Sequence, residues 1–347
     1  MLPRRPPHSP RRILIIRFSS LGDVLLTSPV IRQLRQHHPE AEIDFLVRRE
    51  YADLVRYNPH LSTTIEFDAT SGSKGLQQLK SHLRDRGYDV ILDLHRSLRS
   101  RYLCLGYRRG RVLSVRKHVV LRFLLVHFKI NLYRRRFSHP PSVPEKYLRA
   151  AAPLGVDIRD TAPELYLPEA VQQAGARRWQ ALSADGFGVI MAPGARHFTK
   201  RWPTEAYAAL IEKLFRQYGW RTVMVGGPEE REIIRDILRR TEAAGPISLA
   251  GDISLLETCA LMAQAPLFIS NDSGLMHVAA AFRRPQIAIF GSTTRELGFF
   301  PRNPRAVVVE NTGLSCRPCS HIGRASCPKG HFRCMREITP EQVFRVA

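Results

Sequence analysis

The sequence predicts an α/β protein made of two Rossmann-like domains, each with a parallel sheet covered by helices. Short apolar strands alternate with helical segments twice along the chain, over residues 12–94 and again over 188–291. The strands are apolar almost throughout, as in residues 13–16, which is typical of parallel strands buried on both faces. A length of 347 residues also exceeds one ordinary core and favours two domains.

The first array accounts for the N-terminal domain. Strands are expected at 12–17, 42–47, 63–67 and 89–94, and helices at 24–37, from about 50, and at 76–86. Residues 96–137 carry eleven arginines and show no clear period. Six prolines between residues 138 and 168 predict a linker region.

The second array accounts for the C-terminal domain. Strands are expected at 189–192, 221–225, 247–249, 267–270 and 285–291, and helices at 204–218, from after 230 to about 241, at 255–263 and at 278–282. We therefore divide the chain into a disordered basic tail (1–11), an N-terminal domain (12–165) and a C-terminal domain (166–347) that ends in a cysteine-rich segment. The two sheets should face each other across a cleft, with ligands outside the carboxyl ends of the strands.

The chain carries a formal net charge of +22, which predicts an anionic partner such as nucleic acid, a membrane surface or an acidic substrate. A generally basic surface is the alternative. The most apolar stretch, 119–132, is interrupted by Arg122, His127 and Lys129 and is too short to span a bilayer. Residues 1–12 lack the apolar core of a signal peptide, so we expect a cytoplasmic protein.

Residues 271–277, Asn-Asp-Ser-Gly-Leu-Met-His, stand between a predicted strand and a predicted helix. The first-turn amides of a helix have no partner inside it, and the helix dipole adds partial positive charge there. Phosphate is a natural ligand of such a site. The motif therefore predicts a phosphorylated ligand, with Asp272 and His277 beside it.

Three further loops at strand ends carry residues suited to such a ligand. Gly22 allows close backbone approach, and Asp23 either caps the next helix or acts as a general base. Lys200 precedes Pro203 at a helix start, where it either binds phosphate or is solvated. Residues 226–230 are either a ribose- or phosphate-facing turn or an acid-rich helix start. No GxGxxG follows the first strand and no GxxxxGK[ST] occurs, which argues against a nicotinamide dehydrogenase and a P-loop kinase.

The cysteines fall into two groups. Cys104 and Cys259 lie in apolar runs and are expected to be inert core residues. The other four can close a tetrahedral structural zinc site, and the first two have zinc-ribbon spacing, whereas the last two do not. Iron–sulfur ligation is a second interpretation, and His321 and His331 are alternative ligands. Free thiols or a redox-labile disulfide are the alternative. The four cysteines of this C-terminal group are Cys316, Cys319, Cys327 and Cys334.

Four separated motifs, in order, give the chain a family resemblance. Residues 13–29 resemble the opening of glycosyltransferase family 9, the heptosyltransferases of lipopolysaccharide core assembly. Residues 192–195 with 200–203 are similar to the donor loop of that family, and 226–230 and 271–277 match its later motifs. The resemblance runs from about residue 12 to the end, and the cysteine-rich tail is similar to that of members resembling the second heptosyltransferase.

The resemblance implies a GT-B fold and an inverting transfer of heptose from ADP-L-glycero-β-D-manno-heptose to the Kdo/heptose–lipid A inner core, with no cofactor needed for catalysis. Asp23 matches the general base, and Lys200 would stabilise the departing diphosphate. Arg196 stands where some members have hydroxyl residues and is expected to contact phosphate. The other implied contacts are Asp272 with sugar hydroxyls, Ser273 and Gly274 with phosphate through their amides, His277 with phosphate or sugar, Glu230 with ribose, and Ile253 near adenine.

The resemblance also gives the positive charge a partner. The phosphorylated lipid acceptor lies at the inner face of the inner membrane, so the protein is expected to bind that anionic surface peripherally. The basic and apolar residues 119–137 are either an interfacial helix or a core helix with snorkelling arginines. Two other functions stay open: the same fold with another sugar donor, and a basic nucleic-acid-binding protein with a zinc module. The basic residues lack interleaved aromatics, which disfavours nucleic acid as the partner.

Overall fold

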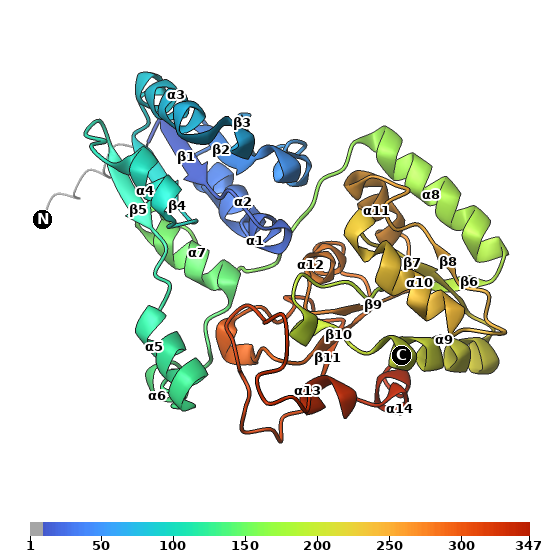
Figure 1. The fold of residues 1–347 in the computed structure, drawn as a ribbon. Coiled ribbons are helices and arrows are strands. Elements are labelled where there is room, and N and C mark those ends of the chain that lie inside the picture. The colour runs from blue at the N-terminus through green and yellow to red at the C-terminus, as the bar shows by residue number, and fades with distance from the viewer. Residues whose placement is uncertain (1–9) are drawn as a thin grey trace, which may run out of the picture. The chain divides into compact units, whose positions relative to one another are not determined.

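The computed structural model describes residues 10–347, which form two compact units (Figure 1). The first unit contains the chain up to Lys117 together with Val143–Tyr166, and the second contains His118–Ser142 and Leu167–Ala347. The predicted tail lies outside the described residues except for its last two positions. Arg11 is already held there, because its backbone N–H donates to Asp89 Oδ2 at 2.6 Å.

The first unit is built on a five-stranded parallel sheet in the order β3-β2-β1-β4-β5. Leu14 and Ile16 of β1 are fully buried on the face that packs against Leu83 of α3. Side chains alternate along a strand, so Ile13 and Ile15 are buried on the opposite face. The strands are β1 (Arg12–Ile16), β2 (Glu42–Arg48), β3 (Thr63–Phe67), β4 (Val90–Asp93) and β5 (Arg111–Ser114).

The helices of this unit depart from the sequence prediction at four places, one of which is a helix at Leu98–Cys104, where none was expected. The helix expected at 24–37 is two helices separated at Thr27, and the one expected from about 50 is a short 3-10 helix. The predicted linker contains α7, whose Pro144 occupies the first turn, where a missing N–H costs nothing. The helices are α1 (Leu21–Leu25), α2 (Ser28–His37), α3 (Gly72–Arg86), α4 (Leu98–Cys104) and α7 (Val143–Ala151), with 3-10 helices at Arg49–Leu54, Ala69–Ser71 and Ala152–Leu154.

The second unit is built on a six-stranded parallel sheet in the order β11-β10-β9-β6-β7-β8. The chain moves outward from β6 to β8, returns to β9 beside β6, and moves outward again to β11. The carboxyl ends of β6 and β9 therefore mark the switch point where ligands bind in such sheets. The strands are β6 (Phe187–Ala192), β7 (Arg221–Met224), β8 (Ile247–Ser248), β9 (Leu267–Asn271), β10 (Gln286–Phe290) and β11 (Ala306–Glu310).

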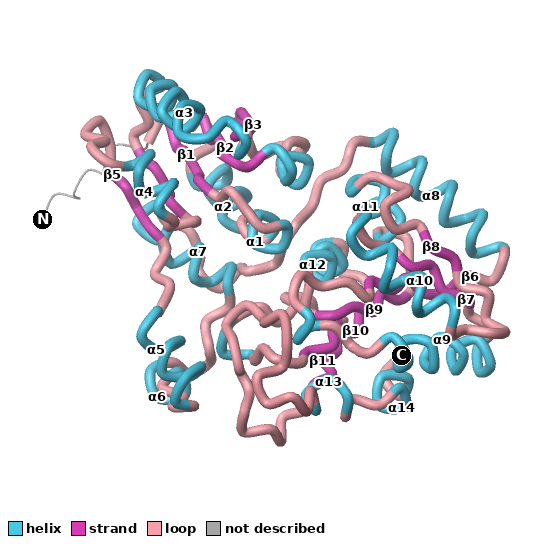
Figure 2. Tube along the Cα trace, viewed as in Figure 1, coloured by secondary structure: helices cyan, strands magenta, loops and turns pink. Residues whose placement is uncertain are grey.

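Helices and short turns cover this second sheet (Figure 2). The predicted helix at 278–282 begins earlier, at Gly274, so the end of the 271–277 motif is itself helical. The helices are α5 (Val119–Phe123), α6 (Tyr133–Arg136), α8 (Glu169–Ala184), α9 (Thr204–Tyr218), α10 (Arg231–Arg239), α11 (Leu255–Met262), α12 (Gly274–Ala281), α13 (Arg333–Arg336) and α14 (Pro340–Phe344). A π-helix spans Leu124–Phe128, and 3-10 helices span Phe198–Lys200, Pro228–Glu230 and Arg295–Leu297.

The domain boundary predicted at 165/166 agrees with the structure within one residue, but one insertion was placed in the wrong domain. Residues 118–142 pack with the second unit, not the first. Lys129 Nζ donates to Pro318 O at 2.7 Å, and Asn131 Nδ2 donates to Glu296 Oε1 at 2.8 Å. Such contacts join residues far apart in sequence and leave no local pattern. No helix within residues 10–347 combines the length and apolar character that a membrane span needs.

Candidate active site

Asp23 lies in the first turn of α1, directly after the loop that follows β1. Arg17 Nη2 is 2.8 Å from its Oδ1, the Tyr147 hydroxyl donates to Oδ1 at 3.2 Å, and Ser20 Oγ donates to Oδ2 at 3.1 Å. The carboxylate also receives a backbone hydrogen bond at Ser20. Ser20, not Asp23, is the N-cap residue of α1, so Asp23 supports the helix start from within its first turn, where a negative charge suits the helix dipole. Sequence reasoning placed Asp23 correctly but missed Arg17 and Tyr147.

The surroundings of Asp23 keep it ionised. Burial opposes its charge, but the Arg17 guanidinium and the hydrogen bonds from Ser20 and Tyr147 outweigh burial and hold the pKa of Asp23 below its ordinary value. Arg17 is itself fixed, because its Nη1 donates to Leu94 O at 2.8 Å. The carboxylate is therefore available to accept a proton, and moving Arg17 away would make it a stronger base.

His95 follows β4 on the same edge of the first sheet, and the sequence gave no reason to select it. Its ring meets Phe18 edge-on, with centroids 5.3 Å apart. Burial lowers the pKa of His95 to about 4, and the nearby Arg17 and Lys117 charges act in the same direction. Asp93 Oδ1 accepts from the backbone N–H groups of His95 and Arg96, which fixes this turn. His95 is thus a neutral imidazole near Asp23 at physiological pH.

In the second unit, Lys200 and Asp272 form a buried ion pair at the switch point. Lys200 Nζ lies 2.7 Å from Asp272 Oδ2, and Thr293 Oγ1 donates to the same oxygen at 2.6 Å. Lys200 ends a 3-10 helix in the loop after β6, and Asp272 follows β9. The solvated-lysine alternative is wrong, since the Lys200 side chain is only 14% exposed.

Asn271 holds the two loops of this site together. Its Oδ1 accepts from the Trp202 backbone N–H at 3.1 Å and from the Tyr207 hydroxyl at 3.2 Å. Its Nδ2 donates to Pro193 O at 2.6 Å. Asn271 is fully buried, so this one amide fixes the end of β9, the loop after β6 and the start of α9.

The start of α12 has the features of an anion site. Ser273 is its N-cap residue, but the hydroxyl makes no capping hydrogen bond. Ser273 Oγ is buried and has no hydrogen-bond partner within residues 10–347. Gly274 opens the helix, so its first-turn amides point at the same place, and His277 is buried one turn further on.

Known proteins are similar to this chain over most of its length. A profile described as glycosyltransferase family 9 (heptosyltransferase) matches residues 76–328. The chain belongs to glycosyltransferase family 9. It is 27% identical to lipooligosaccharide heptosyltransferase 2 of Haemophilus influenzae over 96% of this chain and 97% of that protein. It is 28% identical to lipopolysaccharide heptosyltransferase 3 of Escherichia coli, over 78% of this chain and 80% of that protein.

Solved structures agree on the fold. The structure of E. coli ADP-heptose LPS heptosyltransferase II matches with a TM-score of 0.73 and 24% identity, covering 96% of this chain and 97% of that one. The predicted GT-B class of two Rossmann-like units is thereby confirmed, and the chain is a glycosyltransferase. That the two sheets face each other across a cleft stays a prediction.

Glu230 connects two of the family motifs within the second unit. Its Oε2 accepts from the Gly227 backbone N–H at 2.5 Å. A Cβ atom on Gly194 would overlap the Glu230 side chain, so the loop after β6 and the turn after β7 touch through this carboxylate. Burial raises the pKa of Glu230. A hydrogen-bonding carboxylate here fits the predicted ribose contact, which stays a prediction.

Three other predicted residues have less distinctive surroundings. Gly22 is buried within α1 beside Asp23. Ile253 is half-buried in the loop between β8 and α11, where the Gly251 N–H donates to Gly226 O at 3.0 Å. Arg196 is exposed, and it is Arg201 that ties this loop, donating from Nε to Ala195 O at 2.7 Å.

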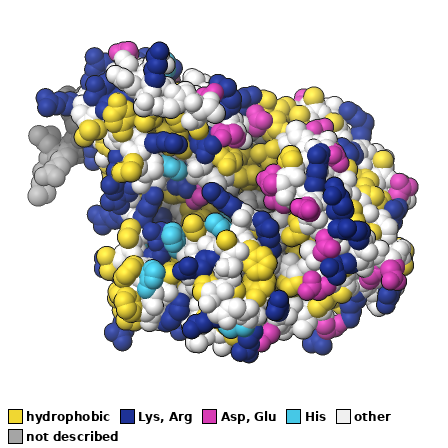
Figure 3. All heavy atoms as spheres, in the orientation of Figure 1, with side chains coloured by type: hydrophobic (Ala, Val, Ile, Leu, Met, Phe, Trp, Pro, Cys, Tyr) yellow, Lys and Arg dark blue, Asp and Glu magenta, His cyan; other side chains and the backbone are white. Residues whose placement is uncertain are grey.

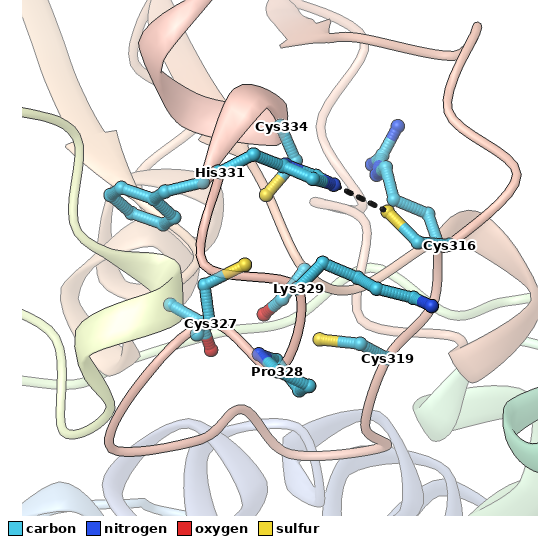
Figure 4. A pocket seen from close by; sticks show the side chains of 11 residues that line it. Cys316, Cys319, Cys327, Pro328, Lys329, His331 and Cys334 are labelled. Atoms are coloured by element: carbon cyan, nitrogen blue, oxygen red, sulfur yellow. Dashed lines mark hydrogen bonds between the residues drawn. The ribbon is translucent and has the colours of Figure 1, made fainter.

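The four C-terminal cysteines converge on one pocket (Figure 4). His331 also lines it, with Nε2 3.9 Å from Cys316 Sγ, whereas His321 does not. All four thiols are free, and within residues 10–347 no three His, Cys, Asp or Glu side chains are already set for a metal ion. The pocket adjoins the donor loop, because Thr199 lines it and the Arg324 N–H donates to Thr199 Oγ1 at 2.8 Å.

Proposed function

We propose that this family 9 enzyme transfers heptose from ADP-L-glycero-β-D-manno-heptose to the Kdo/heptose–lipid A inner core of lipopolysaccharide, with inversion at the anomeric carbon. The names of its relatives, heptosyltransferases 2 and 3, support the reaction class. The observation that carries the proposal is the buried Lys200–Asp272 pair beside the start of α12. It offers one cation, one carboxylate and a set of free amides, which suit a sugar diphosphate.

In the proposed step, the Asp23 carboxylate takes the proton from the acceptor hydroxyl as that oxygen bonds to the anomeric carbon. The bond from this carbon to the diphosphate oxygen breaks on the opposite face, and ADP leaves with the electron pair. A single displacement of this kind inverts the centre and needs one base. The lowered pKa of Asp23 makes it a weak base, so proton transfer fits late in the step, when the acceptor oxygen has become acidic.

The donor diphosphate competes with Asp272 for Lys200 in this proposal. When a phosphate oxygen pairs with the Lys200 ammonium, the Asp272 carboxylate keeps its hydrogen bond from the Thr293 hydroxyl. Its remaining acceptor positions are then available to sugar hydroxyls. The Lys200 ammonium and the α12 amides then stabilise the charge that develops on the leaving diphosphate. The chain's own residues supply positive charge at the leaving group, so we propose that catalysis needs no cofactor.

For the cysteine pocket we propose a structural metal ion, zinc, held by Cys316, Cys319, Cys327 and Cys334. Four thiols that line one pocket are the donor set of a closed tetrahedral site. Metal analysis of the purified protein tests this, beside a Cys316→Ser, Cys319→Ser variant. A native protein without stoichiometric metal overturns the proposal.

The acceptor is an anionic lipid, so we propose that the enzyme is cytoplasmic and works peripherally at the inner face of the inner membrane. The net charge of +22 supports an anionic surface as partner.

A turnover assay with ADP-heptose and defined truncated core acceptors tests the function. Transfer to a heptose-deficient or singly heptosylated inner core supports it and identifies the acceptor position. No transfer from ADP-heptose, with transfer from another nucleotide sugar, would assign a different donor to the same fold.

A further inference from the structure

Five large apolar side chains of residues 118–130 are exposed on the second unit. They belong to α5, the π-helix that continues it, and the residue pair after that helix. In Figure 3 apolar side chains gather beside basic and histidine ones over the region where Figure 1 labels α5 and α6. We call this set the apolar face: Val119 (57% exposed), Val120 (70%), Phe123 (52%), Phe128 (61%) and Ile130 (47%).

The segment has a buried inner side, which packs on the second unit, and an exposed outer side, whose apolar residues have no role in that packing. Leu125, Val126 and Tyr133 are buried and hold it to the unit. The five-residue turn of the π-helix returns Phe128 to the side of Phe123, with ring centroids 5.9 Å apart. The His127 ring packs against Phe123, with centroids 4.6 Å apart and the ring planes tilted by 39°. The core-helix alternative is therefore wrong for the outer side.

Hydrogen bonds to the rest of the second unit fix the segment that carries the apolar face. Lys129 Nζ donates to both Val126 O and Pro318 O at 2.7 Å, and Asn131 donates to Glu296. Lys129 thus fastens the end of the π-helix to the cysteine-rich loop. A surface that is already ordered loses little conformational entropy when it binds.

The charge around the apolar face is one-sided. Residues 118–142, the stretch of the second unit that carries the face, contain five lysines and arginines and no aspartate or glutamate. Four of these, Arg122 and Arg134–Arg136, lie on α5 and α6 themselves. Glu296 faces the segment, where it accepts from Asn131 and lies near the positive charge of Arg134. Exposed apolar side chains beside an excess of arginines match the chemistry of an anionic bilayer surface, with lipid headgroups for the arginines and acyl chains for the apolar groups.

We infer that the apolar face is a membrane-docking surface that inserts Val119, Val120 and Phe123 below the headgroups of an anionic bilayer. The inference deepens the proposed function, because an acceptor anchored in a bilayer brings the enzyme to such a surface. Binding of the protein to a bilayer can be measured without any sugar transfer.

Vesicle co-sedimentation tests the inference on the full chain. Wild-type protein is mixed with vesicles of phosphatidylcholine alone, or with about one-third phosphatidylglycerol. We expect binding to the anionic vesicles that weakens with salt, and a loss of about tenfold in the partition coefficient for Val119→Ser, Val120→Ser. The matched control is Val307→Ser, Val346→Ser, which changes two exposed valines of the same unit outside the face and should bind as wild type.

Three outcomes overturn the inference. They are no binding of the wild type to anionic vesicles, unchanged binding of the Val119→Ser, Val120→Ser variant, and equal loss in the control. A concentration-dependent dimer that this variant abolishes, without vesicle binding, would assign the face to a second copy and overturns it too. Failure of the proposed function is separate: it appears as absent transfer to a delipidated acceptor, an assay that the serine variant should leave unchanged.

Discussion

The Lys200 ammonium lies 2.7 Å from the Asp272 carboxylate, so the two residues that the sugar diphosphate is proposed to engage hold each other instead. Both side chains are largely buried, and Thr293 is the carboxylate's other partner. Each charge can leave the pair only if another group takes the place of its partner. A phosphate for the lysine and a sugar hydroxyl for the carboxylate would do both at once, so the pair prepares the site for one bipartite ligand.

Replacing Lys200 with methionine should damage both stability and transfer. The variant leaves Asp272 buried without its cation, which should lower the free energy of unfolding by about 3 kcal/mol. Loss of the charge at the leaving diphosphate should reduce kcat by about 100-fold. Denaturant unfolding and steady-state kinetics measure the two effects.

Lys213→Met is the matched control, because Lys213 forms a half-exposed ion pair with Glu341. Its loss should cost under about 1 kcal/mol and leave kcat unchanged. Equal kinetic damage in both variants would remove Lys200 from the mechanism.

Asp23→Asn should abolish most of the transfer while leaving the donor site intact. Without the proton acceptor, kcat should fall by about 10³-fold, with a small change in KM for the donor. Asp85→Asn, at an exposed position of α3, is the control and should retain wild-type rates. If Asp23→Asn transfers sugar at the wild-type rate, Asp23 is not the base.

The Arg17–Asp23 pair predicts a shift in the pH profile. Transfer requires ionised Asp23, and its lowered pKa keeps it ionised until the pH falls below the ordinary carboxylate range. In Arg17→Gln the Arg17 charge is gone and burial dominates, so the pKa of Asp23 rises and the acid limb of kcat/KM moves to higher pH. Arg17→Lys keeps a cation and should restore the limb toward its wild-type place. An acid limb that does not move in Arg17→Gln would show that Asp23 does not set it.

Apolar periodicity was enough to predict most of the two sheets, because β1, β4, β6 and β9 are buried on both faces. It failed at β5, whose Arg111, Val112 and Ser114 are exposed, so its four residues carry no apolar run. It also failed at α7, where prolines that break an interior helix are harmless in a first turn.

The candidate site also contains residues that the sequence could predict and residues that only the fold brings there. Asp23, Lys200 and Asp272 stand at strand ends in recognisable motifs, so sequence could select them. Tyr147 is 124 residues from Asp23 and reaches it only through the fold. Arg17 did carry a signal that was overlooked: it is a charged residue directly after the buried strand β1, at the edge where ligands bind.

Gly194→Ala should weaken donor binding without unfolding the protein. A methyl group at this position would overlap Glu230, whose carboxylate is held by the Gly227 N–H, so the carboxylate must move. If Glu230 binds the ribose, KM for ADP-heptose should rise about tenfold while kcat changes less, because the contact is equal in ground and transition states. Gly313→Ala is the control, since an added Cβ there meets only Asn311 Oδ1, at 3.6 Å. An unchanged KM in Gly194→Ala, with ADP still bound as tightly as in wild type, would take Glu230 out of the donor site.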